Sequence, residues 1–337
     1  MLSAGSSVKQ IGGLQPGDIP DDVLGSTEPL LLKGMVDSWP AAQAGKSGKS
    51  EILHYLQRFC QKREIVVFKG DPEIEGRFFY NEEMNGFNFG RANTTFEFML
   101  NRFGSLEGND TEPSYYIGST AVDIGLPGFR AQNDLALPGL NPLVSIWMGN
   151  KTRIAAHFDN PNNIACVAAG RRRFTLFPPE QIANLYVGPL DFTPAGQAIS
   201  LVDFHHPDLE RYPRFEEAMK NALVVDMEPG DALFLPSLWW HHVEALDPFN
   251  VLVNYWWRSD PAHMGTPMDA LIHALLSIKA LPPEQREHWR TMFDHYIFDD
   301  NPAIFSHIPE SSLGILANLD EATASQLRTL LRSKLEN

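Results

Sequence analysis

Two side chains near the middle of the chain have the chemistry and the spacing to bind one metal ion. His157 and Asp159 lie two residues apart, and residues two apart on a strand point to the same face of a sheet. An imidazole and a carboxylate would then face the same ion. Because a His-x-Asp pair also occurs as an ordinary surface or capping arrangement, it predicts a metal site only if a third ligand exists.

A pair of histidines later in the chain offers that third ligand. Residues 228–231 (EPGD) are typical of a turn, and they precede a short apolar run at 232–235 and then His241 and His242. Two histidines and one carboxylate on one face of an octahedral ion leave three positions open, as non-haem Fe(II) oxygenases require. Zinc sites favour four ligands, often thiolates, and the chain has only two cysteines. Strand alternation alone does not choose between His241 and His242.

Several segments of the chain resemble one known family. They are "HFDNPNNIACVAAGRRRFTLFPPEQIANLY" from residue 157, "LVDFHHPDLERYPRF" from 201, "PGDALFLPSLWWHHVEAL" from 229, "VNYWW" from 253 and the lead-in "EPLLLKGMVDSWPA" from 28. Together they resemble the JmjC/cupin-like Fe(II)- and 2-oxoglutarate-dependent oxygenases. The similarity is greatest to the branch that contains the factor-inhibiting-HIF asparaginyl hydroxylase, and it extends over residues 28–258.

The resemblance implies a specific set of iron ligands and a specific cation for the co-substrate. The ligands are His157, Asp159 and His241, because the family's Trp-Trp-His pattern selects the first histidine of the pair. His242 is then expected to be a buried structural histidine. Arg172 occupies the position of the lysine that binds the distal carboxylate of 2-oxoglutarate in this branch. A guanidinium can bind a carboxylate through two parallel hydrogen bonds, so the exchange is chemically reasonable.

The arginine run at 171–173 is consistent with that role for its central member. On a strand, Arg172 points to the face opposite that of Arg171 and Arg173, so it can face inward while they lie in solvent. A solvated strand edge is the alternative interpretation of all three.

Other family positions are carried over to the co-substrate pocket. Asn163, Asn254 and Tyr116 match residues that hydrogen-bond 2-oxoglutarate or line its pocket, although each could equally be a satisfied buried polar group. Thr152 would supply the family's carboxylate-binding threonine if a two-residue insertion is assumed, because Ile154 occupies the ungapped position. Trp256 matches an aromatic residue of the substrate pocket beside the iron.

The substrate is expected to be a protein or peptide side chain rather than a small molecule. The asparaginyl hydroxylase grips its target amide with an Arg-Gln pair, and the corresponding residues here are Ala198 and Ile199, which cannot form those hydrogen bonds. The alternatives are a demethylase or small-molecule hydroxylase of the same family, or a non-catalytic cupin that only binds. His205 and His206 could form a second metal site, although surface histidines are the simpler interpretation.

Short apolar or alternating runs separated by Pro, Gly and Asp predict the scaffold that must position these residues. They indicate a jelly-roll barrel, a double-stranded β-helix of the cupin type, with an α/β lead-in and C-terminal helices. The expected strands are 64–68, 115–118, 143–148, 164–168, 173–177, 222–225, 232–235 and 250–255. The expected helices are 51–60, 95–103, 268–276, 283–298 and 321–335. We therefore assign residues 1–260 to the oxygenase domain and 261–337 to a helical segment.

Composition limits the partners and the compartment. A net charge of -15 disfavours a broad nucleic-acid interface. The sequence shows neither a secretory signal nor an apolar run long enough to cross a membrane, and Cys60 and Cys166 are expected to be free thiols. These features predict a cytoplasmic protein without a membrane partner. The C-terminal helices could form a homodimer, as they do in the enzyme that the chain resembles, or pack on their own barrel.

Overall fold

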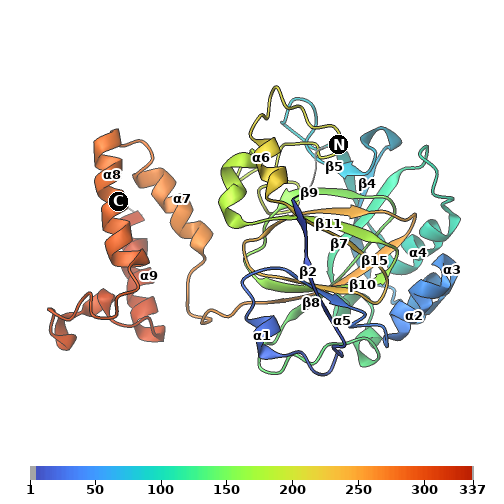
Figure 1. Cartoon of the computed structure of the whole chain (residues 1–337), viewed down its shortest axis with the longest axis horizontal. Helices are drawn as coiled ribbons and strands as arrows, with labels where there is room; N and C mark the ends of the chain where they lie inside the picture. Colours follow the sequence, from blue (N-terminus) through green and yellow to red (C-terminus); the bar gives the residue numbers. More distant parts are fainter. Residues whose placement is uncertain (1–4, 336–337) are drawn as a thin grey trace. The chain divides into compact units, whose positions relative to one another are not determined.

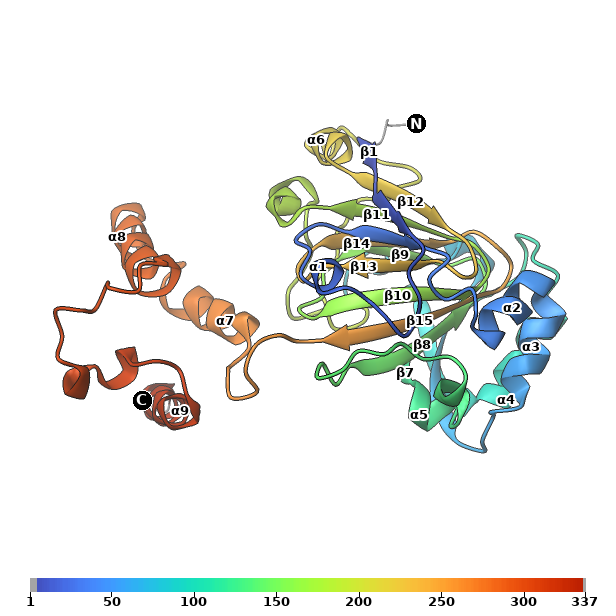
Figure 2. The ribbon, with the colours of Figure 1, turned by 60° about the horizontal axis from the view of Figure 1, so that its bottom comes forward.

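Eight consecutive strands form two facing layers of a β-sandwich (Figures 1 and 2). In the larger sheet of the computed structural model, which describes residues 5–335, neighbouring strands follow the order β13-β10-β15-β8; in the smaller sheet the order is β12-β11-β14-β9. All these pairings are antiparallel. The strands are β8 (Leu143–Gly149), β9 (Arg153–His157), β10 (Asn162–Ala169), β11 (Arg172–Phe177), β12 (Leu223–Met227), β13 (Ala232–Leu235), β14 (Trp240–Ala245) and β15 (Asn250–Trp257). The predicted double-stranded β-helix is therefore confirmed.

The lead-in extends both sheets. The larger sheet continues beyond β8 with β7, β4 and the edge strand β6, in that order. Beyond β13, at its other end, it continues with β3 and then β2. In the smaller sheet, β1 lies next to β12 and β5 lies next to β9. These strands are β1 (Ser6–Ser7), β2 (Lys9–Gly12), β3 (Leu30–Lys33), β4 (Glu64–Gly70), β5 (Arg77–Phe78), β6 (Phe89–Thr95) and β7 (Ser114–Ala121). The lead-in thus lies in the same unit as the barrel, which runs to Ser259.

Strand alternation divides the larger sheet into two apolar faces. Ile146 on β8, Ile164 on β10 and Val253 on β15 are fully buried on the outer face, where they pack beneath helices. Ala165 on β10 and Leu252 on β15 point the other way, into the core between the two sheets. Polar residues that share this inner face therefore point into the sandwich.

Three helices cover the outer face of the larger sheet, at one side of the molecule (Figures 1 and 2). They are α2 (Pro40–Ser47), α3 (Lys49–Gln57) and α4 (Phe96–Ser105). Helix α4 begins where the Thr95 hydroxyl accepts a hydrogen bond from the backbone N–H of Phe98, and it buries Phe96, Met99 and Phe103 on one stripe. The shorter helices of this unit are α1 (Asp21–Leu24), α5 (Val122–Gly125) and α6 (Phe215–Lys220), with 3₁₀ turns at Pro72–Ile74, Phe129–Ala131 and Pro179–Asn184.

Besides the short lead-in strands β1, β2, β3 and β5, three further strands differ from the sequence-based expectations. β6, β9 and β14 were not expected as separate strands, and β9 and β14 contain two of the candidate metal ligands. β14 is buried along its whole length although it contains two histidines and a glutamate, so its composition does not show the alternation that identifies a strand. β9 is short and alanine-rich, and β6 is polar because it lies at a sheet edge.

Residues from Asp260 onward form a second, helical unit. Its helices are α7 (Pro267–Ser277), α8 (Pro283–Phe293) and α9 (Glu321–Leu335), with a π-helical turn at Asp294–Phe298 after α8 and 3₁₀ turns at Glu310–Ser312 and Gly314–Leu316. The Thr266 hydroxyl caps α7 by accepting a hydrogen bond from the N–H of Asp269. Within the described part of this unit, only Thr323 and Ala324 are buried.

Within residues 5–335, none of the helices combines the length and the apolar character needed to span a membrane.

Candidate active site

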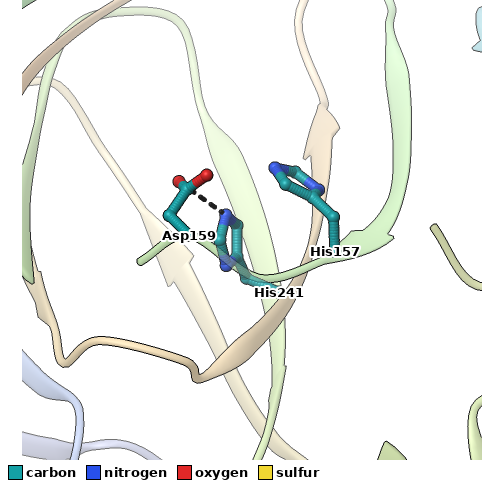
Figure 3. A group of neighbouring side chains, drawn as sticks. All are labelled: His157, Asp159 and His241. Atoms are coloured by element: carbon teal, nitrogen blue, oxygen red, sulfur yellow. Dashed lines mark ion pairs between the residues drawn. The ribbon is translucent and has the colours of Figure 1, made fainter. Parts of the chain in front are cut away.

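His157, Asp159 and His241 come together between the two sheets. Their ligand atoms all lie within 4.8 Å of one another, and the three side chains point toward one another (Figure 3). Nε2 of His241 lies 3.6 Å from Oδ2 of Asp159, and the two imidazole rings are 4.2 Å apart at their centroids. Two imidazole nitrogens and one carboxylate oxygen fit Fe(II) and leave room for further ligands.

The backbone fixes which nitrogen of each histidine is available to a metal. Nδ1 of His157 lies 2.9 Å from the carbonyl oxygen of Ala155, and Nδ1 of His241 lies 3.0 Å from that of Trp239. A carbonyl oxygen only accepts, so Nδ1 carries a proton in both rings, and Nε2 is the nitrogen left to bind a metal. Such a hydrogen bond to the second ring nitrogen is a common way of orienting metal-binding imidazoles.

Burial keeps His241 uncharged in the metal-free protein. Burial, with the neighbouring His157, lowers the pKa of His241 to about 4, against the opposite effect of Asp159. At neutral pH His241 is therefore an imidazole that can bind a cation without first losing a proton.

Strand pairing distinguishes His241 from His242. His241 lies directly opposite His157 in the antiparallel pairing of β14 with β9, whereas His242 points to the other side of β14. There its ring stacks on Phe204 at a centroid distance of 4.3 Å, and burial lowers its pKa to about 3. The structure thus brings His241, and not His242, to the other two candidate ligands.

A bulge in β9 allows His157 to face inward. His157 pairs with His241, but Ile154 pairs with Val243, so three steps on β9 correspond to two on β14. A β-bulge of this kind reverses the side to which the following residues point. Ile154 and His157 therefore both line the same cavity.

Asp159 lies beyond the end of β9, so strand alternation does not position it. Its backbone carbonyl accepts a hydrogen bond of 2.9 Å from the N–H of Leu238, a residue with φ of 67° just before β14. A leucine in this left-handed region is strained, and such strain often occurs at functional sites. Oδ1 of Asp159 accepts a further hydrogen bond of 2.9 Å from Nε2 of Gln197, a contact that the sequence did not predict.

The three residues open onto a cavity of about 250 Å³ between the sheets. Most of its wall is apolar or aromatic. The aromatic residues that line it are Phe68, Phe78, Phe89, Tyr116, Trp147, Phe174 and Trp256. Trp147 and Trp256 pack edge to face at 5.6 Å, and Nε1 of each is buried without a hydrogen-bond partner in the described part of the chain.

Arg172 brings a positive charge into this cavity. Only 2% of the residue is exposed, whereas the side chains of Arg171 and Arg173 are 56% and 43% exposed and form ion pairs with Asp247 and Asp226. Nε and Nη2 of Arg172 are buried without a partner among residues 5–335. Burial lowers the pKa of Arg172 to about 10, so the guanidinium remains charged at neutral pH.

The structure places four other predicted residues on the same cavity. Asn163, Asn254, Tyr116 and Trp256 all line it. Nδ2 of Asn254 donates a 3.0 Å hydrogen bond to Oδ1 of Asn163, and Oδ1 of Asn254 is buried and finds no partner in the described residues. These unpartnered polar atoms fit a polar ligand bound between the triad and Arg172.

The predicted role of Thr152 requires correction. Thr152 is buried but does not line the cavity; it lies before β9, where its carbonyl accepts a hydrogen bond from the N–H of Ala245. Ile154 lines the cavity instead, so the two-residue insertion assumed from the sequence is not needed. An apolar side chain therefore stands where the resembling branch has a hydroxyl.

His205 and His206 do not form a second metal site in the part of the chain that the structure describes. Neither belongs to a group of three possible ligands, and Nε2 of His205 contacts Oε1 of Glu244. Of the two residues that replace the Arg-Gln pair, Ile199 lines the cavity, whereas Ala198 is buried outside it.

Comparison with known proteins identifies relatives. The model of the cupin-like domain family matches residues 16–263. The human HSPB1-associated protein 1 is 25% identical over 287 residues, which cover 81% of this chain and 57% of that protein. The lysine-specific demethylase JMJ31 of Arabidopsis thaliana is 35% identical over 129 residues, or 36% of this chain and 23% of that protein. The tRNA wybutosine-synthesizing protein 5 of Gallus gallus is 23% identical over 302 residues, 80% of this chain and 87% of that protein. The chain therefore spans less than two thirds of the first two.

The two buried histidines predict how stability depends on pH. Unfolded His241 and His242 take up protons near pH 6.5, but the folded, metal-free protein does not protonate them until about pH 4 and pH 3. The unfolded state therefore binds more protons as the pH falls below 6.5, and each histidine lowers the free energy of unfolding by at most about 1.4 kcal/mol per pH unit. Urea unfolding in chelator at pH 7, 6 and 5 should show this slope, and His242→Phe should reduce it. His54→Phe, at an exposed position, is the control, and an unchanged slope in His242→Phe would contradict the prediction.

Proposed function

The chain belongs to the cupin-like domain family, and from that premise we propose that it is an Fe(II)- and 2-oxoglutarate-dependent oxygenase that hydroxylates a protein or peptide side chain. Fe(II) held by two histidines and a carboxylate supplies O₂ activation, which couples decarboxylation of 2-oxoglutarate to oxidation of a C–H bond. The protein's own groups then bind the reactants, orient them and exclude water.

The observation that carries this proposal is a buried guanidinium in the same cavity as the triad, to which the described residues 5–335 offer no ion pair. Burying an unpaired charge is costly, so a fold retains one where a ligand of opposite charge binds. Nε and Nη2 of Arg172 are both free to donate, which matches the two oxygens of a carboxylate. A dianionic keto acid such as 2-oxoglutarate would use both the triad and Arg172, because one end can bind the metal while the carboxylate at the other end reaches Arg172.

Each remaining group has a role in this scheme. His157, Asp159 and His241 would hold the metal, and the hydrogen-bonded pair Asn163–Asn254 lies where it can contact the co-substrate. Burial raises the pKa of Tyr116, so its hydroxyl stays protonated and can donate to a carboxylate. The aromatic wall excludes water from the reacting atoms.

The charges of the cavity support an uncharged target side chain. Of the described residues that line it, Asp159 is the one acidic residue, and its two oxygens already face Gln197 and His241. At the edge of the aromatic wall, the guanidinium of Arg91 lies 5.0 Å from the ring centroid of Phe68. A second cation, such as an ammonium, would find no counter-charge there and would be repelled by Arg91.

Demethylation is the main alternative within the same chemistry. One relative is named a lysine-specific demethylase, and an N-methyl substrate would use the same metal and co-substrate. The cavity charges favour hydroxylation of a neutral group. A small-molecule substrate and a cupin that binds without catalysis remain alternative outcomes of the experiments below.

We also propose that the second unit associates with a second copy of the chain. Its helices leave large apolar side chains exposed, such as Leu276 at 75% and Phe298 at 68%. Helices with unburied apolar faces are typical of interfaces between subunits.

The first test measures succinate release from 2-oxoglutarate in the presence of Fe(II) and ascorbate. Asp159→Ala should abolish turnover, because it removes a metal ligand. Arg172→Met should raise the KM for 2-oxoglutarate about 10- to 100-fold, the effect expected for lost hydrogen bonds to a charged group. Arg172→Met should also raise the free energy of unfolding of the ligand-free protein, because it removes an unpaired buried charge.

Arg173→Met is the matched control for that variant, because it removes an exposed arginine from the same strand. Its KM should equal that of the wild type. An absence of turnover in the wild type and in every variant would favour the non-catalytic alternative.

The substrate class can be tested by mass spectrometry. Proteins of a lysate incubated with wild-type enzyme, but not with Asp159→Ala, should gain one oxygen atom on uncharged side chains. Loss of methyl groups from lysine with release of formaldehyde would instead identify a demethylase, and oxidation confined to metabolites would identify a small-molecule hydroxylase.

Self-association can be tested by light scattering during size-exclusion chromatography. The wild type should have the mass of a dimer, and Leu276→Asp should shift it toward the monomer, because a charge in an apolar interface is costly. Ile182→Asp, which changes an exposed apolar residue of the first unit, should have no effect. A monomeric wild type at all micromolar concentrations would refute the proposal.

A further inference from the structure

Gln197 contacts the metal-binding carboxylate without being one of the three ligands. Its Nε2 donates a hydrogen bond of 2.9 Å to Oδ1 of Asp159, while Oδ2 of Asp159 faces Nε2 of His241 at 3.6 Å. The two carboxylate oxygens, which are chemically equivalent in a free side chain, therefore have different partners.

We infer that Gln197 is a positioning residue that holds Asp159 as a one-oxygen ligand to the metal. This inference rests on the proposed function and adds a residue to it. A carboxylate can bind a metal through one oxygen or through both, and rotation about its last side-chain bond interconverts the two modes. A hydrogen bond to Oδ1 opposes that rotation, and it is strengthened because the acceptor is charged.

The number of open metal positions depends on this choice. Two histidines and a one-oxygen carboxylate leave three positions on an octahedral ion, which suffice for the two donor atoms of a keto acid and for O₂. A two-oxygen carboxylate would occupy one of them. Gln197 therefore favours the coordination number that the co-substrate requires.

Two hydrogen bonds, one on each side of Gln197, anchor its segment to neighbouring strands. The N–H of Ser200 donates a 2.7 Å hydrogen bond to the carbonyl of Ala156, the residue before His157. On the other side of Gln197, Nη2 of Arg91 donates a 2.5 Å hydrogen bond to the carbonyl of Pro194. The segment is thus tied both to β9 and to β6, and it presents Gln197 to the cavity.

The carboxylate of Asp159 accepts a side-chain hydrogen bond from Gln197, and this bond restrains the orientation of the carboxylate. Mutation of a residue that hydrogen-bonds a metal ligand commonly weakens the binding of the metal.

The experiment uses the whole 337-residue chain, stripped of metal, with Co(II) as the probe. Gln197→Met removes the donor while keeping the length of the side chain. Calorimetric titration should show Co(II) binding about 10-fold weaker than in the wild type. The visible absorbance of bound Co(II), which reports coordination number, should also differ from that of the wild type, and 2-oxoglutarate should bind less tightly to the Co(II) form.

Gln181→Met is the matched control, because Gln181 is a partly buried glutamine on the same connection between β11 and β12 whose side chain contacts Asn184. It should bind Co(II) with wild-type affinity and give the wild-type spectrum. Gln197→Glu keeps the shape and polarity of the side chain but places a second carboxylate against Asp159. It should change the Co(II) spectrum as well, which keeps the test decisive if Gln197→Met folds poorly.

The outcomes separate this inference from the proposed function. If the wild type binds Co(II) and 2-oxoglutarate but both Gln197 variants match it in affinity and spectrum, Gln197 is only a structural residue and the inference is wrong. If the wild type binds no Co(II), the proposed function itself fails.

Discussion

The site depends on the antiparallel pairing of two short strands, β9 and β14. Their register places His157 directly opposite His241, and the bulge in β9 allows Ile154 and His157 to face the same cavity. Asp159 lies in the loop after β9, and its backbone carbonyl accepts a hydrogen bond from the N–H of Leu238, just before β14. A one-residue slip between these strands would turn one imidazole away from the other, because side chains alternate along a strand.

The second constraint is electrostatic. Among the residues that the structure describes, the buried guanidinium of Arg172 has no ion-pair partner at the cavity, whereas the two neighbouring arginines pair with Asp226 and Asp247 at the surface. An unsatisfied charge lowers the stability of the empty protein, which is a common cost of a preformed binding site. The ligand that relieves it is expected to be an anion.

Recognition of that anion differs from what the resemblance alone implied. The branch that the chain resembles combines a lysine with a threonine, whereas this cavity presents Arg172 and the apolar Ile154. The longer, planar guanidinium supplies two donors from one side chain, so the missing hydroxyl need not be replaced at the same place. The unpartnered N–H groups of Trp147 and Trp256 are additional donors on the same wall.

The sequence by itself predicted the fold class from strand periodicity and turn signals, and the spacing of His157 and Asp159 made them candidate ligands, because spacing and periodicity are local properties. The choice of His241 and the binding role of Arg172 came from the resemblance to a known family. The sequence could not determine the choice between His241 and His242 from alternation, the exclusion of Thr152 from the cavity, or the contact between Gln197 and Asp159. Those features depend on strand register, on a bulge and on a loop that returns to the barrel from a distant part of the chain. Register and loop return are set by packing across the whole sandwich, and only the tertiary structure contains that information.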